Sequence, residues 1–140
     1  MTPLERVMAR VKRVGDVNKP GTPCPLLTIA EFFDGNDDPG SIGCNLLASP
    51  PPSVMRAMFE KIAARSDVKD VRIAVTQIDE PDWPFSDTVF VMTAVEPEEV
   101  YSWFPDELAP DEVLVQPFDN FAFEPYEVPA GAKPILCWWD

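Results

Sequence analysis

The sequence predicts an α+β fold, in which helices pack on one face of an antiparallel or mixed sheet of four to five strands. Short segments rich in β-branched and aromatic residues alternate with helical segments that carry capping signals. Prolines separate these segments and keep the expected strands short. Because 140 residues is a common length for one domain, residues 1–140 are expected to form a single α+β domain.

Residues 71–95 contain the two strongest strand patterns and are expected to form a β-hairpin. Val71, Ile73 and Val75 mark the first strand, and β-branched and aromatic residues dominate residues 88–93 on the second. The connection over residues 79–86 is too long for a tight turn, and two prolines restrict its backbone. It holds three carboxylates and two large aromatic rings, so this tip is an unusual feature of the chain.

Residues 2–14 are expected to form a basic amphipathic helix. Thr2 is a good N-cap, Pro3 suits the first helical position, and Gly15 follows the last turn. The apolar side chains recur at helical spacing, and most of the basic ones lie on the other side. We expect this helix to pack on the core and to offer its cations to the acidic half of the chain.

Other local signals place the remaining elements. Thr28 and Glu31 fit a capping box before a short helix over residues 29–34. Ser53 is the expected N-cap of an amphipathic helix over residues 54–65. The other expected elements are a short aromatic helix that begins at Pro97 and strands over residues 44–47, 113–116, 121–123 and 135–139.

The net charge of −13 is distributed unevenly along the chain. Residues 1–72 carry ten basic and nine acidic side chains, whereas residues 73–140 carry fifteen acidic side chains and one basic side chain, Lys133. A polyanionic surface repels nucleic acid and anionic membranes, and it attracts a basic protein. The sequence therefore predicts a basic protein partner, and it disfavours nucleic acid and membrane as partners.

The chain contains no histidine, which excludes Ser-His-Asp and Cys-His catalysis and histidine-ligated metal sites. Its three cysteines have no CxxC spacing, so we expect them to be reduced, and no cofactor is predicted. No apolar run approaches the roughly 20 residues that span a bilayer, and the N-terminus has no apolar signal region. These observations favour a cytoplasmic protein without catalytic activity.

The loop over residues 34–43 suggests a different function. Asp34, Asn36 and Asp38 have the alternating spacing of the first ligands in an EF-hand loop. Pro39 then stands where the glycine of that motif belongs, and Asn45 stands where its bidentate glutamate belongs. A divalent-cation-binding protein or metal-dependent enzyme is therefore one alternative, and a tight acidic turn with Asx geometry is the other interpretation of this loop.

The hairpin connection is the preferred candidate for a binding site, because aromatic anchors rimmed by charge are typical of protein interfaces. Trp83 and Phe85 are expected to be exposed, since prolines and carboxylates flank them in a loop. Glu98 and Glu99 are the expected rim charges. A homodimer built on aromatic patches is a third possible function. The predicted contact residues of the connection are Asp79, Glu80, Asp82, Trp83, Phe85 and Asp87.

Three runs of sequence carry a resemblance: FFDGNDDPGSIGCNL, DEPDWPFSDTVFVMTAVEPEEVYSWF and the C-terminal ILCWWD. They resemble small uncharacterised bacterial proteins, some of which are immunity partners of polymorphic or contact-dependent toxins. The resemblance covers about half of the chain and brings no catalytic residues. It implies an immunity-type function, in which the protein binds a toxin domain in the cytosol, and a basic toxin domain would suit the acidic charge.

Overall fold

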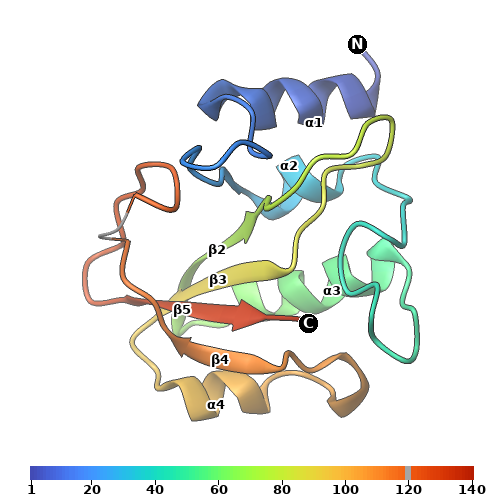
Figure 1. Cartoon of the computed structure of the whole chain (residues 1–140). Helices are drawn as coiled ribbons and strands as arrows, with labels where there is room; N and C mark the ends of the chain where they lie inside the picture. Colours follow the sequence, from blue (N-terminus) through green and yellow to red (C-terminus); the bar gives the residue numbers. More distant parts are fainter. Residues whose placement is uncertain (119–120) are drawn as a thin grey trace.

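A computed structural model of the chain describes residues 1–118 and 121–140, and in these residues five strands form one antiparallel sheet in the order β1-β2-β3-β5-β4 (Figure 1). The α+β fold predicted from the sequence is confirmed. The strands are β1 (Leu26–Leu27), β2 (Val68–Ala74), β3 (Thr88–Thr93), β4 (Glu112–Val115) and β5 (Lys133–Trp138). The helices, with η marking 3₁₀ turns, are α1 (Pro3–Val11), η1 (Lys12–Val14), α2 (Ile29–Phe33), α3 (Pro52–Ala63), α4 (Pro97–Ser102) and η2 (Asp106–Leu108).

The predicted hairpin lies at the centre of the sheet. β2 pairs with β3 from Val68 opposite Thr93 to Ala74 opposite Thr88, and all six residues of β3 are buried. The regular ladder ends at Ala74, but a backbone hydrogen bond still joins the two arms beyond it. The Thr76 amide donates to the Phe85 carbonyl at 2.9 Å. The connection from one strand to the other therefore spans residues 75–87 and is longer than the sequence predicted.

The capping predictions hold for the first two helices. The Thr2 hydroxyl accepts a hydrogen bond from the Glu5 amide at 3.1 Å, and Thr28 and Glu31 form the complete capping box. The prediction that Ser53 caps α3 is wrong, because the helix already begins at Pro52 and Pro51 is its N-cap. Proline has the backbone angle of a first helical residue and lacks the amide that a helix start leaves unpaired.

The two faces of the sheet have different covers. The buried aliphatic, methionine and aromatic side chains of the helices all belong to one large core cluster, so the prediction of helices on one face is confirmed. On the other face, Phe90 and Met92 pack beneath side chains of the irregular segment that follows β4, including Phe118 and Phe123. The rings of Phe90 and Phe123 meet edge to face, with 4.9 Å between their centroids.

Three predictions about short strands need correction. Residues 44–47 form turns, and Leu47 is fully exposed, so this apolar run has no partner strand. The strand expected over residues 121–123 is reduced to one bridge, in which Phe123 lies parallel to Cys24. The short strand β1 has no pattern of its own in the sequence and was missed.

Among the described residues, no helix is long and apolar enough to span a membrane.

Arg10 connects α1 to the rest of the molecule. Its side chain is only 12% exposed, and its guanidinium donates to Glu31 at 3.0 Å, to Glu124 at 2.5 Å and to the Leu26 carbonyl at 3.0 Å. Lys12 pairs with Glu80 at 2.6 Å in a second contact with the acidic half. These ion pairs confirm that the basic helix offers cations to the acidic half of the chain.

Replacing Arg10 by glutamine should lower the free energy of unfolding by about 3 kcal/mol, because it leaves the largely buried carboxylate of Glu124 without a cation. Urea unfolding at neutral pH measures this change. Lys19→Gln removes an exposed cation that has no ion pair in the described residues, and it should change stability by less than about 0.5 kcal/mol. Equal effects of the two variants would contradict the structural role of Arg10.

Glu31 should make part of this stability depend on pH. Burial opposes its ionisation, but the Thr28 amide and the Arg10 guanidinium outweigh burial and hold the pKa of Glu31 below its ordinary value. A lowered pKa contributes stability above the pKa of the unfolded chain and loses it as the pH falls. The difference in unfolding free energy between wild type and Glu31→Gln should therefore be largest near neutral pH and shrink in acid, as measured by urea unfolding across pH.

Candidate functional site

The tip of the central hairpin lies beside α1 and the loop that follows α2 (Figure 1). Two contacts fasten its first half. The Asn18 side chain donates to the Ile78 carbonyl at 2.7 Å and accepts from the Ile78 amide at 3.0 Å, and the ion pair from Lys12 reaches Glu80. The connection is thus fixed by side chains of the segment that leaves α1.

Trp83 fastens the second half of the tip, and its predicted exposure is wrong. The side chain is 8% exposed and belongs to the main core cluster, and its indole N–H donates to the Phe32 carbonyl at 2.9 Å. Its backbone amide donates to Asp38 at 3.3 Å. Phe85, which was also expected to be exposed, is half-buried. The aromatic rings of the connection therefore hold the loop in place instead of facing a partner.

The carboxylates of the tip face the solvent. Asp79, Glu80 and Asp82 are exposed, and so is Asp37 on the neighbouring loop. A hollow of about 340 Å³ lies between the two loops, with Asp37 and Asp82 in its lining. Within the described part of the chain, Asp37, Asp79 and Asp82 have no cation within 4 Å. We call these four carboxylates, Asp37, Asp79, Glu80 and Asp82, the tip surface.

The other predicted contact residues do not join this surface. Asp87 is half-buried at the last position of the connection, directly before β3, where it accepts a hydrogen bond from the Thr88 hydroxyl at 2.8 Å. Glu98 and Glu99 are exposed on α4, which follows the opposite end of β3 (Figure 1). Because a six-residue strand is about 20 Å long, these two glutamates lie far from the tip.

The three predicted ligands, Asp34, Asn36 and Asp38, are engaged within the protein. Asp34 pairs with Arg56 at 2.9 Å, and the Asn36 side chain accepts from the Asp38 amide and donates to Ser41. Asp38 accepts from the Gly40 amide at 2.8 Å and from the Trp83 amide. These bonds confirm the Asx geometry of the turn. In the described residues, no group of three acidic or cysteine side chains is arranged to hold a metal ion.

Asp37 was not among the contact residues predicted from the sequence. The sequence analysis considered this acidic run only as a cation-binding loop. The spacing of Asp34, Asn36 and Asp38 suggested that function and left Asp37 out. The structure brings this run and the hairpin connection together through the bond between Asp38 and Trp83. The arrangement offers fixed negative charges, and it suits the binding of cations on another molecule.

The fold and the tip define a small acidic α+β protein with a negatively charged loop surface that side-chain contacts hold in place. The chain belongs to the uncharacterized protein YfbO family, whose pattern matches residues 2–137. It is 46% identical, over the full length of both chains, to "Uncharacterized protein YfbO" of Escherichia coli strain K12. No solved structure matches the chain. The resemblance to small uncharacterised bacterial proteins is confirmed, and the association with immunity proteins finds no support in these matches.

Trp83→Phe should lower the free energy of unfolding by about 2 kcal/mol, because the buried Phe32 carbonyl loses its donor. Trp138→Phe is the matched control: its ring is half-buried, and its indole N–H has no partner in the described structure. That variant should lose no more than about 1 kcal/mol. Thermal or urea unfolding of both variants measures the difference, and an equal loss would contradict the anchoring role of Trp83.

Proposed function

We propose that the protein is a non-catalytic binding module whose tip surface docks a basic protein in the cytoplasm. The observation that carries the proposal is that Asp79 and Asp82 are exposed without a cation partner in the described residues, on a loop that contacts of Trp83 and Asn18 hold in place. In its narrowest form, the partner is a basic toxin domain and the protein is its immunity factor. The sequence resemblance alone suggests that form.

Rigidity supports this proposal as much as charge does. A loop that is already ordered loses little conformational entropy when a partner binds, so more of the interaction energy appears as affinity. Fixed carboxylates also steer a basic partner during diffusional encounter, and salt weakens this steering. An ordered acidic tip therefore favours fast, salt-sensitive association with a cationic surface.

No specific contact favours the alternatives in the same way. The cation-binding alternative would have to take Asp34 from Arg56 and Asp38 from the Gly40 and Trp83 amides. The homodimer alternative depended on exposed aromatic patches, but the ring of Trp83 is buried and that of Phe85 is half-buried. The rings of the connection thus leave little aromatic surface for a second copy at the tip.

The double variant Asp79→Asn, Asp82→Asn should fold normally and lose its partner, because both side chains are exposed and unpaired. The test is affinity capture from bacterial lysate at low and high salt, followed by identification of the retained proteins. We expect a basic protein that the wild type retains at low salt and that both high salt and the double variant release.

The matched control is Glu98→Gln, Glu99→Gln, which removes the same charge from α4 at the other end of β3. This control should retain the partner as the wild type does. Identical capture by the wild type and both double variants would reject the tip surface as the binding site. Loss with both double variants alike would show a general effect of net charge and would also count against the proposal.

A further inference from the structure

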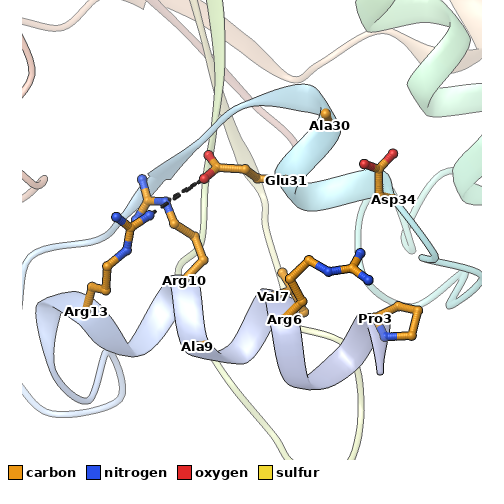
Figure 2. Close-up of a pocket in the computed structure, with 9 residues that line it drawn as sticks. All are labelled: Pro3, Arg6, Val7, Ala9, Arg10, Arg13, Ala30, Glu31 and Asp34. Atoms are coloured by element: carbon orange, nitrogen blue, oxygen red, sulfur yellow. Dashed lines mark hydrogen bonds and ion pairs between the residues drawn. The ribbon is translucent and has the colours of Figure 1, made fainter. Parts of the chain in front are cut away.

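A second hollow lies between α1 and α2, and Pro3 lines both this hollow and the one at the tip. Its volume is about 430 Å³ (Figure 2). Ala9 on α1 and Ala30 on α2 both line it, and their small side chains leave the space open. Three arginines of the first helical segment, Arg6, Arg10 and Arg13, line it at spacings of four and three residues, so they share one side of the helix.

The carboxylates of this hollow are already paired. Glu31 pairs with Arg10 at 3.0 Å and accepts a hydrogen bond from the Thr28 amide at 2.9 Å. Asp34 pairs with Arg56 at 2.9 Å. Arg10 is in turn fully occupied by its contacts with Glu31, Glu124 and the Leu26 carbonyl. These acids and Arg10 are therefore engaged in contacts within the protein.

The other two arginines are available. Arg13 is 66% exposed and only approaches Glu31, at 3.7 Å. Arg6 is exposed, and among the described residues it is the one arginine without an ion pair. Seven residues separate Arg6 from Arg13, which is about 10 Å along a helix at 1.5 Å per residue. The hollow thus presents two accessible guanidinium groups at its two ends, with Ala9 between them on α1 and Ala30 on the facing helix α2.

We propose that this hollow binds a small organic dianion, with one oxyanion group at Arg6, the other at Arg13 and the carbon chain over Ala9 and Ala30. Guanidinium groups bind carboxylate or phosphate oxygens through paired, charge-assisted hydrogen bonds. An apolar spacer suits the alanine-lined middle of the hollow. The inference does not depend on the proposed function, because the tip surface and the hollow share none of these residues.

The experiment is a titration of the isotope-labelled full chain at low salt with succinate, adipate and suberate, followed by the amide NMR signals of Ala9 and Ala30. Hexanoate and inorganic phosphate are the single-ended probes. We expect saturable shifts with at least one dicarboxylate and weaker binding of both single-ended probes. Arg6→Gln and Arg13→Gln should each weaken dicarboxylate binding about tenfold, because each removes one charge-assisted contact.

Lys69→Gln is the control variant, since Lys69 is an exposed cation on β2 without an ion pair in the described residues. It should bind the dicarboxylate as the wild type does. The proposal is overturned if no dicarboxylate gives saturable shifts at these alanines. It is also overturned if phosphate or hexanoate binds as tightly as the dicarboxylates, or if the Lys69 variant loses as much affinity as the two arginine variants.

Discussion

The burial of β3 on both faces is the constraint on which the rest of the structure depends. A strand that is buried on both sides requires a cover on each face of its sheet. Helices supply one cover, and an irregular segment after β4 supplies the other. Such a segment has few ladder hydrogen bonds to hold it in place. Side-chain bonds fasten it instead: Arg10 holds Glu124, and the Tyr126 hydroxyl donates to Asp70, which Arg72 also binds at 2.9 Å.

Local signals explain which parts of the fold could be predicted from sequence. Thr2, Thr28 and Pro97 each mark a helix start within a few residues, and the strands β2 and β3 carry their own β-branched pattern. The strand β1 has only two residues, and long-range bonds from Arg10 and Glu124 determine its place. No local pattern reveals such bonds. The run at residues 44–47 shows the converse, because apolar residues without a neighbouring strand form turns.

The candidate site was predicted in composition but not in orientation. Acidic and aromatic residues do gather at the hairpin tip, but Trp83 points into the core while Asp79 and Asp82 face the solvent. The free carbonyl of Phe32 near the end of α2 decides this, because it accepts the indole N–H. The position of that carbonyl depends on the packing of α2 against the hairpin, which the sequence around Trp83 does not contain.

The basic residues of the helix α1 and its short continuation η1 contribute to different parts of the molecule. Lys12 pairs with Glu80 at the acidic tip, and Arg10 pairs with Glu124 of the segment after β4. Arg6 and Arg13 line the hollow beside α2. Because the net charge is −13, carboxylates outnumber cations, and an arginine without an ion pair is unexpected. Arg6 lies within the same hollow as Asp34, yet Asp34 pairs with Arg56. A cation that contributes no ion pair to the fold remains available to an anion from solution, and this separates Arg6 from the structural role of Arg10 on the same side of the helix.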